Sequence, residues 1–394
     1  MLLHRLEFDA GRDLEIFASV PAQPAVFLLR GEAGTEPYVS KTANLRRRLQ
    51  RLLSVREENS KRLNLRNQVR FFEYSPSGSD FESGFLLYQL FRNEFPKTYA
   101  ARLRLRFAPL VKLHLENEFP RASITSRMGR AGGKSLYFGP FLSRVNAEKF
   151  ANDSLDFFKM RRCVEDLHPD PQFPGCIYSE MKMCLAPCFK GCSEDEYRVE
   201  VGRVQAYFES AGQSLESELS RQREEASNHL EFESAAGLHA RLEKLKPVLA
   251  QLPEIVRRID RLAGLIVQPS AEENSVTLFR VDGGCVAGPA TFAIQTSEHT
   301  KSQSMESRVQ QAVAAMQPFV ARTALEKMDH LAILKRWYYR GTRLGEIFFA
   351  NAEGVLPMRR IVRGISRVYR GEQPETQPVN LSSAISGPSS TTPE

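Results

Sequence analysis

Short apolar runs separated by polar turns dominate the first hundred residues. PAVFLLRG at 24–31 has the length of a buried strand, and the polar turn EAGTEP leads from it to a second short strand at 38–39. An arginine-rich helix follows. VRFFEY at 69–74 predicts a third strand, after which the turn SPSGSD opens a helix over 81–93. The pattern predicts a small α/β unit of roughly one hundred residues.

Longer helical patterns and one strong hairpin pattern occupy the rest of the chain. Apolar alternation on either side of Asp282-Gly283-Gly284 predicts a β-hairpin, because such turn residues match the twist of paired strands. The other predicted elements are, in chain order, strands in LVKLHL (110–115), ASITSR (122–127) and SLYFGPF (135–141), a helix over 145–160, a charged amphipathic helical pair over 196–251, a helix and a strand within 331–350, and a helix over 361–369.

These elements predict an α+β multidomain fold. At 394 residues, with 42% hydrophobic and 26% charged residues, the chain is long enough for two to four globular domains. The last twenty or so residues are rich in Ser, Pro and Thr, cannot bury a core, and are expected to be disordered. The expected domains are 1–104 (small α/β), 105–195 (cysteine-containing), 196–253 (helical), 254–371 (C-terminal α/β) and 372–394 (tail).

Basic residues are concentrated near the N-terminus. The chain has 54 Lys and Arg against 47 Asp and Glu, and the segment 40–70 alone holds ten basic and two acidic residues, a net charge of +8. Such a cluster favours polyanion binding, since each phosphate contact releases condensed counterions. The alternative is a solvated helix face. The aromatic run Trp337-Tyr338-Tyr339 also has two interpretations, which are base stacking and core packing.

Four of the six cysteines fall within twenty-six residues: Cys163, Cys176, Cys184 and Cys188. Disulfides need an oxidising compartment, and the opening segment has no basic stretch followed by the apolar run of about 7 to 15 residues that a secretion signal requires. No stretch approaches the roughly 20 apolar residues of a membrane span. We therefore expect reduced thiols, a cytoplasmic location and no membrane association.

A metal centre is the most specific interpretation of these four thiols, whose spacing is C-x12-C-x7-C-x3-C. Structural zinc sites typically use tight C-x(2–4)-C pairs, whereas irregular spacing suits an iron–sulfur cluster that the protein wraps from several directions. Spacing alone leaves zinc as an alternative. Cys192 and Cys285 lie outside the pattern, and core packing or chance explains them.

Four motifs, in order along residues 20–250, together resemble the UvrC family of bacterial excision repair. PAVFLLR followed by YVSKTANLRRRLQRLL resembles the family's GIY-YIG nuclease opening, and NEFPRASITSR followed by YFGPF resembles its next stretch. The four cysteines match the spacing of the family's cluster, which implies a [4Fe–4S] group. EASNHLEFESAAGLHARLEKL resembles the UVR motif, a helical hairpin that docks on UvrB. We expect the family's C-terminal ribonuclease H-like and helix-hairpin-helix domains to be lacking.

The nuclease site that the resemblance implies is incomplete. GIY-YIG enzymes place a metal-binding glutamate, two tyrosines and an arginine around the scissile phosphate, where the metal and arginine stabilise developing charge. The residual catalytic candidates are Tyr38 and Arg48. Phe27 stands at the first tyrosine position and Leu87 at the glutamate position, and leucine cannot bind a cation. Glu82, about 140° round the helix from Leu87, is expected on another face. Mg²⁺ or Mn²⁺ is expected only if the nuclease is active.

The resemblance also implies two binding surfaces. The candidates for DNA contact lie on or before the arginine-rich helix: Lys41, Arg46, Arg47 and Arg48. The candidates for UvrB contact form an apolar stripe at helical spacing: Leu230, Phe232, Ala235, Ala236 and Leu238. The expected function is that of a UvrC-like repair protein that binds UvrB and damaged double-stranded DNA, with an inactive nuclease site. An active metal-dependent endonuclease, or a nucleic-acid-binding module outside repair, are the alternatives.

Overall fold

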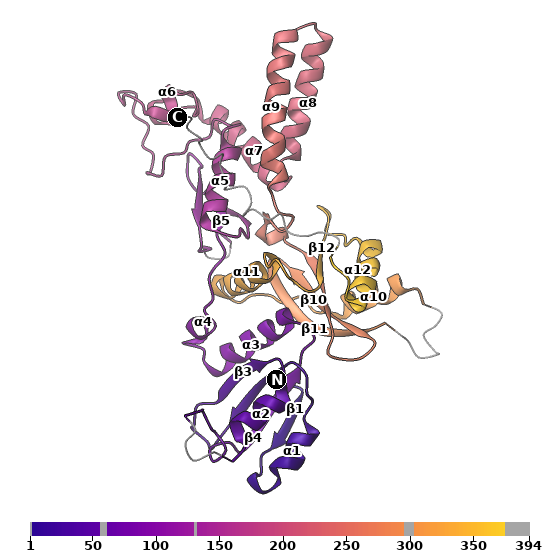
Figure 1. Ribbon diagram of the computed structural model, residues 1–394. Coiled ribbons are helices and arrows are strands. Elements are labelled where there is room, and N and C mark those ends of the chain that lie inside the picture. Colours follow the sequence, from indigo (N-terminus) through magenta and orange to yellow (C-terminus); the bar gives the residue numbers. More distant parts are fainter. Residues whose placement is uncertain (1, 56–60, 130–131, 295–302, 375–394) are drawn as a thin grey trace, which may run out of the picture.

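The computed structural model describes residues 2–55, 61–129, 132–294 and 303–374. Within these ranges the protein is α+β, with three four-stranded antiparallel sheets and helices packed around them. Figure 1 shows the N-terminal sheet at one end, the sheet of the C-terminal segment in the middle, and the third sheet with a long helical hairpin at the other end. The predicted α+β class is confirmed, and the predicted tail lies outside the described residues except for 372–374.

The N-terminal sheet has the strand order β1-β4-β2-β3. Its elements are β1 (His4–Glu7), a 3-10 turn (Ala10–Arg12), α1 (Asp13–Ser19), β2 (Ala25–Arg30), β3 (Tyr38–Thr42), α2 (Leu45–Leu53) and β4 (Phe71–Pro76). The three predicted strands are present. β1 was not predicted, because HRLE has no apolar alternation and is ordered by pairing with β4, His4 opposite Tyr74.

The helix α3 (Asp80–Glu94) joins the N-terminal domain to the C-terminal segment. Ser79 caps it by accepting the Glu82 backbone N–H at 3.1 Å. Its aromatic side chains belong to a core cluster shared by the third sheet and the C-terminal segment, and not to that of the N-terminal sheet. The ring of Phe81 meets Phe279 edge-on with centroids 4.9 Å apart. A short helix, α4 (Tyr99–Arg102), follows.

The third sheet has the order β6-β5-β7-β8 and carries the cysteine segment. Its elements are β5 (Leu110–Leu113), β6 (Ala122–Thr125), β7 (Leu136–Gly139), α5 (Arg144–Leu155), α6 (Ile177–Glu180), a 3-10 turn (Pro187–Phe189) and β8 (Arg257–Arg258). The predicted helix over 145–160 ends at Leu155, because Phe158 and Met160 are buried by a non-helical segment beyond it.

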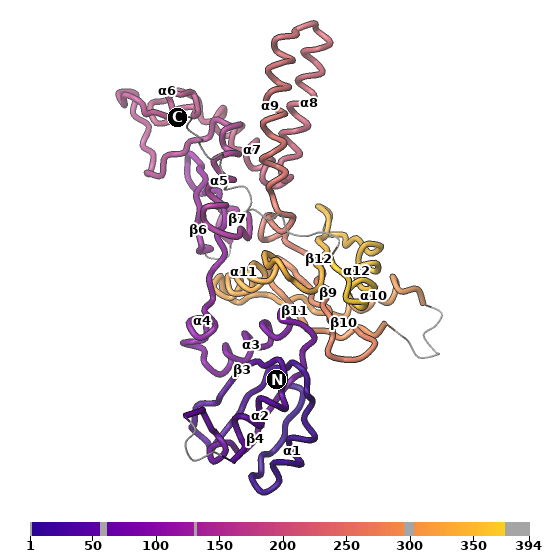
Figure 2. The backbone as a smooth tube through the Cα atoms, in the orientation of Figure 1, coloured from indigo at the N-terminus to yellow at the C-terminus, as the bar shows by residue number. Residues whose placement is uncertain are grey.

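Three helices, and not the predicted pair, follow the cysteines: α7 (Glu194–Glu209), α8 (Gln213–Asn228) and α9 (Phe232–Ala250). Gly212 separates α7 from α8 at φ +93°, a conformation that favours glycine. A Cβ atom on Gly212 would lie 2.1 Å from Leu249 Cδ2, so the Leu249 side chain would have to move for any larger residue. The hairpin of α8 and α9 extends away from the rest of the chain (Figure 2).

The C-terminal segment is a sheet of order β11-β10-β9-β12 covered by helices. Its elements are a 3-10 turn (Ile259–Arg261), β9 (Gly264–Pro269), β10 (Ser275–Asp282), β11 (Cys285–Ala293), α10 (Met305–Ala315), α11 (Ala324–Tyr338), β12 (Glu346–Phe349) and α12 (Met358–Arg370). The predicted hairpin is confirmed, with Asp282 opposite Cys285. No helix within the described ranges combines the length and apolarity needed to cross a membrane.

The helix α11 connects the other parts of the molecule. Lys335 donates to the carbonyl of Phe107 at 3.4 Å, and the hydroxyl of Tyr339, just beyond the helix, donates to the carbonyl of Pro140 at 2.9 Å. Trp337 and Tyr338 are buried, so core packing accounts for most of the aromatic run. The face of α11 that contacts α3 also forms ion pairs, and it lies next to the candidate nuclease site.

Candidate functional site

The residual catalytic pair lies together. Tyr38 begins β3 and Arg48 lies on α2, and the guanidinium of Arg48 donates to the Tyr38 hydroxyl at 2.8 Å. Asn44 places the helix by accepting the backbone N–H of Arg47 at its N-cap. Phe27 packs beside Tyr38 with ring centroids 6.1 Å apart and is fully buried, so this position offers no hydroxyl.

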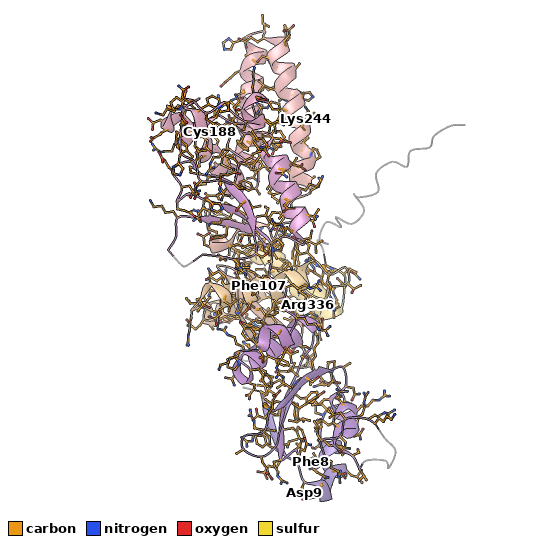
Figure 3. All side chains as sticks on the ribbon, turned by 90° about the vertical axis from the view of Figure 1, so that its left-hand side faces the viewer. Phe8, Asp9, Phe107, Cys188, Lys244 and Arg336 are labelled. Atoms are coloured by element: carbon orange, nitrogen blue, oxygen red, sulfur yellow. The ribbon has the colours of Figure 1, made fainter. Side chains whose placement is uncertain are left out.

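Leu87 lines a pocket of about 290 Å³ bounded by β3, α3, the α4 segment and α11. Neither Tyr38 nor Arg48 is among the described residues that line it. The structure therefore separates the residual pair from the position where the resemblance places the metal ligand. Arg336 of α11 is another lining residue, and Figure 3 labels it in the middle part of the molecule.

Asp80 is the one carboxylate among the described residues that line this pocket. It forms ion pairs with both Lys41 of β3 and Arg340 beyond α11. Burial disfavours the charged form, but the hydrogen bonds and charges of these two cations outweigh it and lower the pKa of Asp80. Because two cations already occupy its oxygens, Asp80 cannot hold a divalent metal ion without losing them.

Glu82 lies away from the Leu87 pocket, as its position on the helix predicts. Its carboxylate accepts the backbone N–H of Gly78 at 2.8 Å, and the side chain is buried. Burial raises the pKa of Glu82 to about 7, against the opposing hydrogen bond from Gly78. The buried carboxylate thus stabilises the turn before α3 and does not substitute for a ligand at the Leu87 position.

A basic groove of about 780 Å³ runs along α2. It carries four arginines and no carboxylate among its described lining: Arg47, Arg48, Arg51 and Arg62. Two of the four predicted DNA contacts therefore face this groove. Lys41 instead pairs with Asp80, and Arg46 donates to the backbone carbonyls of Val20 and Ala18, at 2.8 and 3.2 Å.

The four clustered cysteines share one region. Burial raises the pKa of Cys184 to about 11, the N–H of Ala186 opposes the rise, and the charges of Cys163, Cys188 and Cys176 add to it. Such mutual influence requires thiols that lie near one another. Within the described ranges, however, no three Cys, His, Asp or Glu side chains meet tightly enough to hold a metal ion. The thiols gather in one region without converging on one point.

Buried positive charge accompanies these thiols. Arg161 is 2% exposed, and it donates to Cys163 Sγ at 3.3 Å and to the carbonyl of Phe119 at 2.8 Å. The described residues place no carboxylate against it. A buried cation needs a counter-charge, and a group bound by thiolates supplies one.

The backbone around Cys184 and Cys188 also fits a thiolate centre. The N–H of Ala186 points to Cys184 Sγ at 3.3 Å, the kind of hydrogen bond that metal-bound sulfur accepts. Lys182, Ala186 and Lys190 are in the left-handed region, and strained backbone of this kind concentrates at functional sites. The residues present therefore fit the metal–thiolate group that the spacing suggests.

The tip of the α8–α9 hairpin exposes large apolar side chains. Leu230 and Phe232 are 71% and 68% exposed. Of the remaining predicted contacts, Ala236 is exposed and Ala235 and Leu238 are half-buried. The structure thus divides the predicted stripe, with its N-terminal end open to solvent and its continuation packed inward.

Comparison with known proteins identifies relatives of this chain. Residues 109–207 match the family model described as UvrC/Cho excinuclease, middle domain. UvrABC system protein C of Rickettsia rickettsii (strain Sheila Smith) is 30% identical over 272 residues, which cover 68% of this chain and 42% of that protein. UvrABC system protein C of Acetivibrio thermocellus is 24% identical over 342 residues, which cover 85% of this chain and 54% of that protein. The chain belongs to the UvrC family. It spans about half the length of these relatives, and no solved structure matches it.

The matched middle domain of this UvrC-family chain contains the whole cysteine cluster together with Arg161. Sequence reasoning did not select Arg161 as a site residue, although its place two residues before Cys163 was a usable indication. It also left out Arg51 and Arg62 of the basic groove. Their shared orientation depends on how the chain returns to α2 beyond residue 60, which no local pattern predicts.

Proposed function

We propose that this UvrC-family chain is a nucleotide excision repair protein that binds DNA and UvrB and no longer cuts DNA with its GIY-YIG-like domain. The observation that carries the proposal is the Leu87 pocket: its one carboxylate among the described lining, Asp80, is held by two cations. A nuclease of this type needs a carboxylate free to bind a divalent ion. The names of the relatives support the assignment to repair.

DNA binding is assigned to the groove along α2. Its described lining is rich in arginine and includes no carboxylate, so it presents the positive field that a phosphate backbone requires. Arg48 remains bound to Tyr38, so its guanidinium is oriented before DNA arrives. The groove contacts phosphates and contributes affinity and not sequence selectivity.

UvrB binding is assigned to the hairpin tip. Leu230 is exposed and has φ +62°, a conformation that is strained for a bulky residue. The φ value of Leu230 serves the end of α8, because the N–H groups of Leu230 and Glu231 donate to the carbonyls of Ser227 and Ala226. The side chain is nevertheless left in solvent, and a partner that covers Leu230 and Phe232 would bury both. Two short helices have too little surface to bury Phe232 alone, so a partner helix pair is the expected cover.

The four clustered cysteines are assigned to a [4Fe–4S] cluster. The residues that would hold it are Cys163, Cys176, Cys184 and Cys188. Bound there, the cluster would supply a rigid cross-link among segments that have few regular elements of their own. Arg161 balances the negative charge of the thiolates, and the N–H of Ala186 orients Cys184.

An incision assay tests the proposal. We expect full-length protein to give no nick in a lesion-bearing duplex loaded with UvrA and UvrB, in Mg²⁺ or Mn²⁺, while still shifting the UvrB–DNA complex. The double variant Arg47→Gln/Arg51→Gln should weaken binding and lower the slope of log affinity against log salt concentration by about 2. A nick that disappears in Arg48→Ala would show a working nuclease and overturn the assignment. A missing shift would favour a binding module outside repair.

Replacing Phe232 with Ser should weaken UvrB binding at least about tenfold, because large aromatic anchors dominate interface energies. The measurement is the dissociation constant for isolated UvrB. Val199→Ser on α7 is the matched control, since Val199 is 67% exposed, almost as much as Phe232. Equal loss in both variants would mean that apolar exposure in general, and not the hairpin tip, determines the affinity.

A further inference from the structure

The pocket around Leu87 has more positive charge than its neighbours neutralise. Four cations line it: Lys41, Arg102, Arg336 and Arg340. Asp80 is the one carboxylate among the described lining residues, and Arg102 pairs with Glu36 outside the lining, so four cations against these two carboxylates leave an excess of two positive charges. No ion pair is recorded for Arg336 within the described ranges. An anion is the ligand that this charge favours.

Apolar side chains form one wall of the same pocket. The residues that line it from α3 and the α4 segment include Leu87, Phe91, Leu103 and Leu105. At about 290 Å³ the pocket lies just below the range of about 300–1,000 Å³ that small-molecule sites span. An apolar wall beside cationic side chains suits a ligand that combines a flat, weakly polar part with a phosphate. α11 closes one side, so a DNA duplex is excluded.

The residue at position 87 decides whether a phosphate is attracted or repelled. A carboxylate there would oppose a phosphate unless a metal ion neutralised it. Leu87 removes that repulsion, and the helix α11 and the residues just beyond it add Arg336 and Arg340, which come from a distant part of the chain. The absence of a carboxylate at position 87 and the cations from α11 therefore both favour the binding of a phosphate.

We propose that the pocket between α3 and α11 binds a single nucleotide, with its phosphate against Arg336 and its base against the apolar residues of α3 and the α4 segment. The site does not depend on the proposed role in repair. The nucleotide comes either from solution or from the end of a single DNA strand, because the recognised chemistry is the same.

The chain carries its own reporter of this site. Trp337 is the single tryptophan of the sequence and it lines the pocket. Its indole N–H donates to the carbonyl of Leu344 at 3.1 Å, so the ring is held in place. Tryptophan fluorescence of the full-length protein, excited where tyrosine does not absorb, therefore reports occupation directly. The probes are 2′-deoxyadenosine 5′-monophosphate, a 5′-phosphorylated single-stranded oligonucleotide and inorganic phosphate.

Two variants alter the pocket in different ways. Gly84→Leu fills it, because an added Cβ at Gly84 meets nothing within 4 Å and the glycine is inside α3. Arg336→Gln removes the cation for which no ion pair is recorded. Arg359→Gln on α12 is the matched control for loss of one exposed arginine outside the pocket. Circular dichroism checks that each variant is folded, and Arg336→Gln decides if Gly84→Leu fails that check.

The expected result is a saturable fluorescence change with the monophosphate. Gly84→Leu should abolish it, and Arg336→Gln should raise the dissociation constant about tenfold. Arg359→Gln should bind like the wild type. The same pattern with the oligonucleotide alone would also support the site and would identify a strand end as its source. No saturable change with either probe, unchanged affinity in folded Gly84→Leu, or equally tight binding of inorganic phosphate would overturn the proposal.

Discussion

Replacing Cys184 with Ser should remove the metal centre and unfold the segment that contains Cys163 to Cys192. The charges of the other three cysteines all raise the pKa of Cys184, and its sulfur accepts the Ala186 N–H. A site of this kind rarely exists in the unfolded chain, so its binding free energy is largely folding free energy. Loss of the thiolates also leaves Arg161 buried without a counter-charge, which costs about 3–5 kcal/mol when buried ion pairs are broken.

The measurements are visible absorption, metal and sulfide content of anaerobically purified protein, and hydrogen exchange of residues 163–192. Cys192→Ser is the matched control, because Cys192 lies just outside the four and undergoes the same chemical change. The double variant Cys184→Ser/Arg161→Met should be more stable than Cys184→Ser, since it removes the orphaned charge. If the wild type contained zinc and no iron, the four thiols would form a zinc site and not an iron–sulfur cluster. Wild-type protein without metal would refute both.

Glu82→Gln should make the protein more stable than the wild type at alkaline pH but not at acid pH. Burial raises the pKa of Glu82 from 4.5 to about 7 in the folded state. A raised carboxyl pKa contributes stability that is complete below the unfolded pKa and is lost as pH rises through the folded value. The shift corresponds to about 3 kcal/mol, lost between about pH 4.5 and pH 7.

Glutamine keeps an oxygen that accepts the Gly78 N–H but carries no charge to bury. The free energy of unfolding of variant and wild type, measured by denaturant titration across this pH range, should diverge by about 3 kcal/mol. Glu272, which also raises the pKa of Glu82, provides the control. In the Glu272→Gln protein, the difference in unfolding free energy produced by Glu82→Gln should be smaller but not zero. Parallel pH profiles of Glu82→Gln and wild type would mean that Glu82 is not buried as a carboxylate in solution.

Several site features followed from local sequence because they depend on neighbours along the chain. The strands that hold Phe27 and Tyr38 were predicted from local pattern, and in the structure they pair directly, with Phe27 opposite Ser40. The displacement of Glu82 from Leu87 follows from helix geometry alone. The cysteine spacing indicated a metal centre without any knowledge of the fold, since reduced thiols that cluster along a chain most often bind a metal.

Other features were beyond local reasoning because distant segments create them. Arg340 reaches Asp80 across 260 positions of sequence, and Tyr99 reaches the buried carboxylate of Asp329 at 2.6 Å across 230. Nothing in the pattern of α3 indicated that Phe81 would pack on Phe279 rather than on its own sheet. The predicted helical pair became three helices, with a break around Gly212, against which Leu249 of the later helix α9 packs.

The order of motifs, the apolar periodicities and the cysteine spacing indicated the UvrC family and the α+β class, and they predict that position 87 lacks a metal-binding carboxylate. These are properties of single residues and short segments, so they are written in the sequence itself. The commitment of Asp80 to two cations, the placement of Arg161 against Cys163 and the closure of the Leu87 pocket by α11 came from the three-dimensional fold. Each depends on long-range packing, in which burial and charge of residues far apart in sequence determine which partners meet.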